Sequence, residues 1–361
     1  MTRAERPIAV SLLATFLFGC RQLPPPANSP PPPPASEQLS ESQLTTLTKN
    51  WNCIYTFKDR VYFGKPADHA KGIFIEEAEL ADTFAFSTDG TKLAYWRLDA
   101  SGKMPNGPDA HRHSLIIKDL KTSDATTVTK EQGTADTPGE QLSFSYDGKY
   151  LAYAYGNKLQ IVPLSGAWKY TYQGRAVTGF PEAVNFAPDG KHIAFSRDGD
   201  VFQGQDLRID NLQEDRKGAV FQPFDANRIA PLAEFFDSEG GSSSTPTYAK
   251  QVYWLPGSNS LLAVVARQGG SGWRCVALLK RPKDEDAPYQ GTGPVNYGWE
   301  AKWVTPREEM TFNTSICPDQ KHWTSQHAGR LHFYDLEGNE VGSLPAIDVI
   351  TGDQIIAWAP K

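Results

Sequence analysis

The sequence contains few of the motifs that identify an enzyme. Its 361 residues include only four cysteines, and no two of them have the Cys-x-x-Cys spacing of zinc and redox sites. There is no Gly-x-Ser-x-Gly nucleophile elbow, no phosphate-binding glycine loop with a lysine and no calcium loop of the Asp-x-Asp-x-Asp-Gly type. These absences argue against serine-hydrolase, P-loop and calcium-binding chemistry, and we expect no cofactor.

The N-terminal apolar segment is too short to cross a membrane. Residues 8–18 would span about 16 Å as a helix, whereas a bilayer core needs about 20 apolar residues. Arg3 and Arg6 precede this segment. A positively charged start followed by a short apolar stretch is typical of a secretory signal peptide, which we place at residues 1–19.

The end of this segment resembles the lipobox of bacterial lipoproteins. Leu17-Phe18-Gly19-Cys20 has the small residue before a cysteine that the lipobox requires. The resemblance implies cleavage before Cys20, lipidation of Cys20 and anchoring of the protein to a membrane of the cell envelope. Arg21 stands where an aspartate would indicate inner-membrane retention in enteric bacteria, so we favour the outer membrane. The alternative is an ordinary signal peptide with an incidental cysteine.

A proline-rich linker follows Cys20. Eight prolines occur within residues 24–34. Proline has no N–H to donate, so this run should adopt an extended polyproline II conformation that reaches about 34 Å. We take residues 20–50 as a lipidated, flexible linker and residues 51–361 as the folded domain.

The charge balance excludes nucleic acid as a partner. Removal of residues 1–19 changes the formal net charge from −6 to about −7, because Arg3, Arg6 and Glu5 are lost. Phosphate-backbone binding needs a basic stripe, which the sequence lacks. Three cysteines remain after lipidation of Cys20, so either one disulfide or three buried thiols can form among Cys53, Cys275 and Cys317.

A repeated five-residue word dominates the sequence after residue 51. It reads Phe-Ser-Thr-Asp-Gly at 86–90, Phe-Ser-Tyr-Asp-Gly at 144–148 and Phe-Ala-Pro-Asp-Gly at 186–190. Weaker copies begin at Trp254, Ile316 and Trp358. Glycine takes positive φ at little cost and aspartate bonds to the turn backbone, so each word predicts a hairpin between two strands.

The spacing of these words predicts the fold. The shortest intervals between equivalent positions, 42 residues, match the roughly 40–45 residues of a four-stranded propeller blade. The longer intervals imply insertions. We therefore predict an all-β, six-bladed β-propeller, with seven blades as the alternative if an insertion hides a degenerate blade. Residues 354–359 should pair with the strands near 53–63 and close the ring.

The words are similar to those of the TolB-type propeller repeat of bacterial envelope proteins. TolB has an α/β domain before its propeller, whereas here only about 15 residues separate the prolines from Trp51. The resemblance thus implies the propeller fold and gives little support for a Tol-system role, because propellers have many functions.

Three histidines in the fifth repeat, His322, His327 and His332, are candidate metal ligands. Some TolB-like propellers are oligogalacturonate lyases with a histidine-bound manganese on the axis. This resemblance supplies the alternative of a metal-dependent polysaccharide lyase or hydrolase. The simpler reading, which we favour, is that these histidines bind no metal.

Two insertions carry candidate binding residues. One holds Phe235 and Phe236, and the other holds Tyr297, Trp299 and Trp303. Loop aromatics on a rigid scaffold often mediate recognition. We therefore expect a monomeric, non-catalytic module that binds an envelope protein or polysaccharide.

Overall fold

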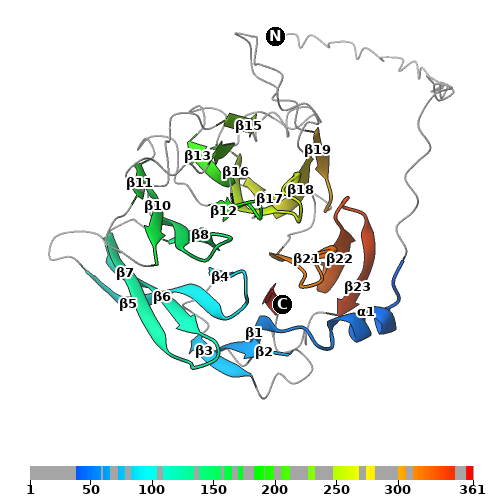
Figure 1. Ribbon diagram of the computed structural model, residues 1–361, viewed down its shortest axis with the longest axis horizontal. Helices are drawn as coiled ribbons and strands as arrows, with labels where there is room; N and C mark the ends of the chain where they lie inside the picture. Colours follow the sequence, from blue (N-terminus) through cyan, green and yellow to red (C-terminus); the bar gives the residue numbers. More distant parts are fainter. Residues whose placement is uncertain are drawn as a thin grey trace, which may run out of the picture. The chain divides into compact units, whose positions relative to one another are not determined.

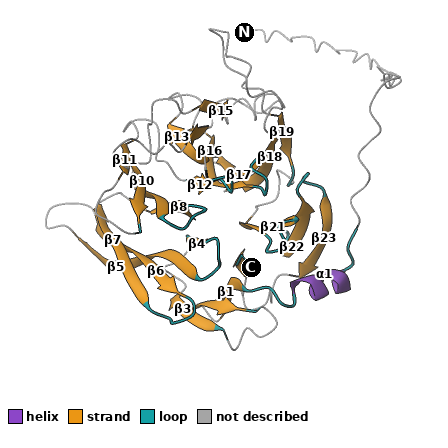
Figure 2. Ribbon diagram, in the orientation of Figure 1, coloured by secondary structure: helices purple, strands orange, loops and turns teal. Residues whose placement is uncertain are grey.

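The described part of the chain consists almost wholly of antiparallel strands, as the repeated words predict (Figure 2). A computed structural model describes residues 38–57, 60–65, 72–77, 83–103, 109–133, 138–155, 158–164, 170–173, 183–190, 192–198, 205–211, 227–231, 247–267, 274–280, 300–305, 312–345 and 355–360. All of them belong to one unit, Ser36–Lys361. The signal segment, Cys20 and the proline run lie outside the described residues.

The described strands form six four-stranded sheets, and we number the sheets in chain order. The first contains β24 (Ile355–Trp358), β1 (Cys53–Phe57), β2 (Arg60–Gly64) and β3 (Ile73–Glu77), and the second contains β4 (Phe84–Phe86), β5 (Lys92–Lys103), β6 (Asp109–Asp119) and β7 (Ala125–Gly133). The third contains β8 (Pro138–Phe144), β9 (Tyr150–Tyr155), β10 (Lys158–Pro163) and β11 (Tyr170–Gln173), and the fourth contains β12 (Val184–Phe186), β13 (His192–Asp198), β14 (Gln205–Asn211) and β15 (Asn227–Pro231). The fifth contains β16 (Thr247–Trp254), β17 (Ser260–Arg267), β18 (Arg274–Lys280) and β19 (Glu300–Trp303), and the sixth contains β20 (Phe312–Ile316), β21 (His322–His327), β22 (Arg330–Asp335) and β23 (Glu340–Pro345).

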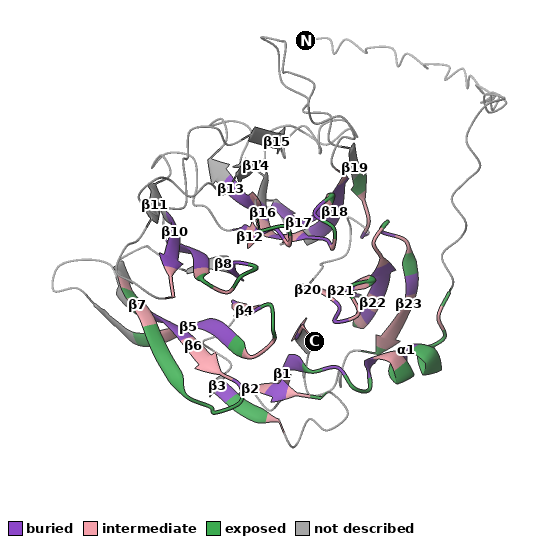
Figure 3. Cartoon of the chain, in the orientation of Figure 1, coloured by how far each residue is buried: buried purple, intermediate pink, exposed green. Residues whose placement is uncertain are grey.

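The sheets surround a common centre in a propeller arrangement (Figure 1). Six apolar clusters are found among the described residues, and each joins two sheets that follow one another, with the last joining the sixth sheet to the first. Figure 3 shows buried segments on strands within the sheets, such as β10, β18 and β22, whereas β7 and much of α1 are exposed. Ala94, Ala152 and Ala194 are fully buried in three of these clusters. Their small side chains allow the close approach between sheets that the repeat predicts.

The predicted pairing of the two ends of the domain is confirmed. β24 pairs antiparallel with β1, so that Cys53 lies opposite Trp358 and Ile54 opposite Ala357. The Ala359 N–H also donates to the Asn52 carbonyl at 2.9 Å. Backbone bonds between the chain ends close the ring and remove one pair of exposed strand edges.

The expected linker is shorter than residues 20–50, because its last part is folded. Helix α1 (Glu41–Thr48) begins with a capping box, in which the Ser40 side chain accepts from the Gln43 N–H and the Gln43 side chain accepts from the Ser40 N–H. The fully buried Leu44 side chain joins the cluster between the sixth and first sheets. Burial of this leucine fixes a segment that its polar composition alone predicted to be flexible.

Helix α1 lies beside β23, the outer edge strand of the sixth sheet (Figure 2). The Leu39 N–H donates to the Val341 carbonyl at 2.7 Å. Gly342 has φ +151°, and a Cβ there would lie 2.6 Å from the Leu39 carbonyl oxygen. The segment before α1 therefore covers this strand edge closely, and only a glycine at 342 permits the contact.

Candidate binding groove

Each strong Asp-Gly word forms a tight turn between the first two strands of its sheet. In the second sheet, Asp89 Oδ1 accepts from the Ser87 hydroxyl at 2.6 Å and from the Thr91 N–H at 3.0 Å. Gly90 has φ +64°, a conformation that favours glycine. Asp147 makes the same contacts in the third sheet, with Ser145 and the Lys149 N–H. These turns are the part of the fold that the sequence specifies most directly.

Polar side chains on the first strands connect neighbouring sheets in a repeating pattern. In each word that shows it, the acceptor is the side chain of the residue just before the aromatic position. It accepts a hydrogen bond from the backbone N–H at the aromatic position of a later word, in the next sheet around the ring. Ser143 Oγ accepts from Phe186 N at 2.9 Å, and Asn185 Oδ1 accepts from Trp254 N at 3.0 Å. Ser315 Oγ likewise accepts from Trp358 N at 3.0 Å. These bonds, two of them buried and one partly buried, hold the sheets in register. They lie beneath the face of the propeller that carries the turns, which we call the turn face.

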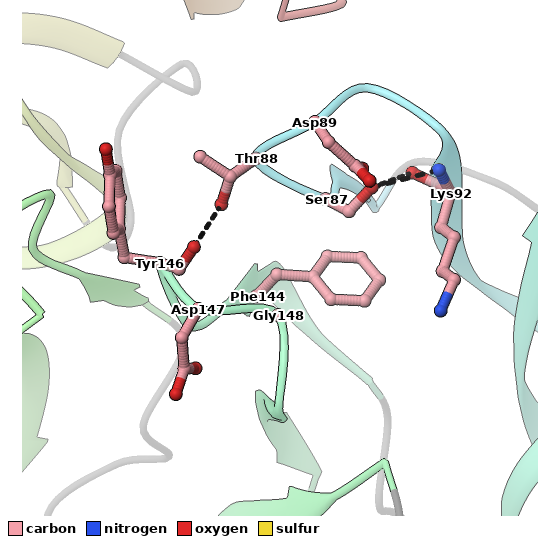
Figure 4. A pocket seen from close by; sticks show the side chains of 8 residues that line it. All are labelled: Ser87, Thr88, Asp89, Lys92, Phe144, Tyr146, Asp147 and Gly148. Carbon is pink, nitrogen blue, oxygen red and sulfur yellow. Dashed lines mark hydrogen bonds between the residues drawn. The ribbon is translucent and has the colours of Figure 1, made fainter.

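Two hollows lie between the second and third sheets on the turn face. The inner one has a volume of about 250 Å³ and is lined by Ser87, Thr88, Asp89, Lys92, Phe144, Tyr146, Asp147 and Gly148 (Figure 4). The outer one has a volume of about 560 Å³ and is lined by Lys92, Ile117, Asp119, Thr122, Asp124, Thr126, Thr127, Val128, Pro163 and Leu164. Lys92 lines both hollows, so we treat them as one feature, the turn-face groove.

Contacts across the inner hollow fix its two walls. The Thr88 hydroxyl donates to the Tyr146 carbonyl at 3.0 Å, which joins the turns of the two sheets (Figure 4). Tyr146 is 57% exposed, although tyrosine is a large and partly apolar residue. An exposed tyrosine at a rigid concave surface has the properties of an interface residue.

Hydrogen bonds lower the pKa of three groove carboxylates, those of Asp89, Asp119 and Asp147. Bonds from Ser87 and from the Thr91 N–H lower the pKa of Asp89 to about 2. The Thr122 and Lys121 N–H groups lower the pKa of Asp119. Burial opposes the charge of Asp147, but bonds from Ser145 and Lys149 lower its pKa on balance. The groove therefore carries negative charge well below neutral pH.

The groove is not apparent from the sequence. Asp89 and Asp147 are recognisable there only as turn residues. Two features of the sequence could have indicated a binding surface. One is the tyrosine within the second word, Tyr146, and the other is the acidic segment between β6 and β7 that contains Asp119 and Asp124. The groove arises only when two such turns from successive sheets lie side by side.

The binding residues expected in the insertions are only partly described. Phe235, Phe236, Tyr297 and Trp299 lie outside the described residues. Trp303 ends β19, where its half-buried ring packs against the cluster between the fourth and fifth sheets. Its visible role is therefore to extend the apolar core, with part of the ring left exposed.

The three candidate histidines do not converge on the propeller axis. His322 and His327 stand at opposite ends of β21, about 17 Å of strand apart, and His322 Nδ1 lies 2.7 Å from Asp319 Oδ2. His327 and His332 stack with ring centroids 3.6 Å apart, and His332 Nδ1 contacts Glu340 Oε1 at 2.9 Å. The described residues contain no group of three or more His, Cys, Asp or Glu side chains that could hold a metal ion.

The three described cysteines, Cys53, Cys275 and Cys317, are buried and form no disulfide with one another. Burial raises the pKa of the Cys53 and Cys317 thiols, so both remain protonated. Of the two alternatives that the sequence left open, the structure has the three buried thiols.

Fold and groove together define a β-propeller with a concave surface between two blades. No protein-family profile and no curated protein matches the chain. TolB from Acinetobacter baumannii is similar in structure, with 16% sequence identity, a TM-score of 0.53, and 89% of this chain and 71% of that chain covered. This likeness shows the propeller fold alone.

Two further solved structures are more distant. A Bacteroides uniformis protein proposed to be a 6-phosphogluconolactonase has 13% identity and a TM-score of 0.47 over 82% of this chain and 83% of that chain. The β-propeller domain of Cps50 (Swd1) from Myceliophteria thermophila has 12% identity and a TM-score of 0.39 over 74% of this chain and 87% of that chain. Among the described residues, no helix has the length and apolar character needed to span a bilayer.

Proposed function

We propose that this chain is a non-catalytic binding module of the cell envelope, in which the turn-face groove binds an envelope protein or polysaccharide. The groove carries the proposal. It lies between the second and third sheets, whose turns are joined by the hydrogen bond from the Thr88 hydroxyl to the Tyr146 carbonyl. The buried Ser143 bond joins the third sheet in turn to the fourth, and these contacts support a groove with preformed walls. A preformed surface loses little conformational freedom on binding, which favours affinity.

The proposed attachment supports this role. A lipid on Cys20, exposed after removal of residues 1–19, would hold the protein at the outer membrane. The proline run would separate the propeller from the lipid by about 34 Å. The tether would thus bring the groove to partners in the envelope while leaving the propeller free to bind them.

The site is tested by cross-linking whole cells and recovering the protein from their envelopes. Tyr146→Ala should reduce the yield of a specific partner about tenfold, because an exposed aromatic at a concave interface commonly contributes 1 kcal/mol or more. Phe74→Ala is the matched control, since Phe74 is a comparably exposed aromatic on β3, away from the groove. Loss of the partner with the Phe74 variant alone would show that the groove is the wrong site.

The anchor is tested separately. Cys20→Ser should abolish labelling by a fatty-acid analogue and release the protein into the soluble fraction, because the sulfur that carries the lipid is lost. Continued membrane association of the unlabelled variant would contradict the anchoring proposal without affecting the groove.

A further inference from the structure

We propose that the turn-face groove binds an extended, positively charged segment of a partner protein, an inference that rests on the proposed binding function. The first reason is its charge. Among the described residues, four carboxylates, Asp89, Asp119, Asp124 and Asp147, and one lysine, Lys92, line the groove. Asp147 Oδ2 is already paired with Lys149 Nζ at 3.0 Å, so the other three carboxylates supply the excess of negative charge. A groove with this excess of negative charge attracts cationic segments and disfavours anionic polymers.

The second reason is the way in which the turns orient the carboxylates. Asp89 uses Oδ1 to accept the turn bonds, and Asp119 uses Oδ1 to accept from the Lys121 and Thr122 N–H groups. Within the described part of the chain, Oδ2 of both residues has no hydrogen-bond partner. The turn therefore keeps each carboxylate ionised and in place while one oxygen remains available to a ligand.

The third reason is the apolar surface between these charges. Ile117, Val128 and Leu164 are half-buried in the outer hollow, and Phe144 lines the inner one. Lysine and arginine place their aliphatic stems along such surfaces while their charged ends reach a carboxylate. The two hollows follow one another along the boundary between two sheets, which suits an extended segment better than a compact ligand.

The test uses the full chain after signal removal and two labelled peptides of about ten residues. One peptide alternates lysine with valine or threonine, and the other has glutamate at the lysine positions. Fluorescence anisotropy should show that the lysine peptide binds and the glutamate peptide does not. Binding of the lysine peptide should weaken as salt rises, because exposed charges are screened.

The decisive variant is Asp89→Asn combined with Asp119→Asn. Asparagine keeps the Oδ1 acceptor that each turn requires and removes only the charge, so the fold should be retained. The dissociation constant for the lysine peptide should rise about fivefold, since exposed ion pairs contribute roughly 0.2–1 kcal/mol each. Glu41→Gln with Glu337→Gln is the control. It removes two exposed charges on α1 and the β22–β23 turn and should leave the constant unchanged.

Three results would overturn this inference. They are equal effects of the two double variants, no effect of either, and binding of the glutamate peptide as tight as that of the lysine peptide. The proposed function fails in a different way. If Tyr146→Ala releases the cross-linked partner while the two asparagine substitutions do not, the partner is bound without the predicted charge contacts. In that case the binding function stands and the inference of a cationic segment is wrong.

Discussion

Removal of the Leu44 side chain should release α1 from the propeller without unfolding the ring. Leu44 is fully buried in the cluster that includes Phe333 and Val341. Leu→Ala substitutions at such positions cost about 2–5 kcal/mol, and each 1.4 kcal/mol changes an equilibrium tenfold. A helix of eight residues is too short to be stable alone in water, so undocking and unfolding of α1 should coincide. We expect the docking equilibrium to fall at least about thirtyfold.

Hydrogen exchange measures this opening directly. The Leu39 N–H, bonded to the Val341 carbonyl, should exchange faster in Leu44→Ala by the same factor. The Cys317 N–H, bonded at the first turn of the sixth sheet, should keep its protection. Thr46→Ala is the control, because Thr46 is exposed on the same helix and alanine favours helix formation. Unchanged exchange at Leu39, or equal acceleration at Cys317, would refute the reasoning.

Two further predictions concern the turns. In chemical denaturation, Gly148→Ala should lower the free energy of unfolding by roughly 1 kcal/mol. Gly90→Ala should lower it by more. Both glycines have positive φ, but only a Cβ at Gly90 would lie 2.7 Å from an oxygen, that of Pro360. Equal losses would contradict this reading of the ring closure. The carboxyl of Asp89 should titrate near pH 2 by NMR, so the stability that its ionised form contributes should be complete above about pH 4 and lost as pH falls through about 2. A midpoint at or above 3.8 would show that the turn bonds do not favour the ionised form.

The part of the fold that the sequence predicted is the part determined by short-range chemistry. Asp-Gly turns, the aromatic residue before them and the small alanine after them recur within single hairpins, and their spacing gives the size of a sheet. The pairing of β24 with β1 followed because each end of the domain lacked the other half of a sheet. This long-range contact was predictable because a propeller ring must close.

The folded segment before residue 51 and the groove were not predictable in the same way. Helix α1 buries Leu44 and Thr48, and two such positions give too weak a periodicity to distinguish a helix from a polar linker. Its stability depends on β23, about 300 positions later in the sequence. It also depends on a glycine at position 342, because any larger residue there would collide with the Leu39 carbonyl. The groove likewise requires side chains from two sheets, so no single stretch of sequence contains its pattern.

The contacts of Gln141 favour a site between blades over a site on the axis. Its buried side chain accepts from the N–H groups of Val252 at 2.8 Å and Val184 at 3.2 Å, and it also donates to the Val252 carbonyl. One amide thus joins the first strands of the third, fourth and fifth sheets. A ligand entering between these strands would have to replace three buried hydrogen bonds, and each buried polar group left unpaired costs about 1–3 kcal/mol. The turn-face groove requires no such exchange at Asp89 and Asp119, because their turn bonds use Oδ1 and leave Oδ2 without a hydrogen-bond partner among the described residues.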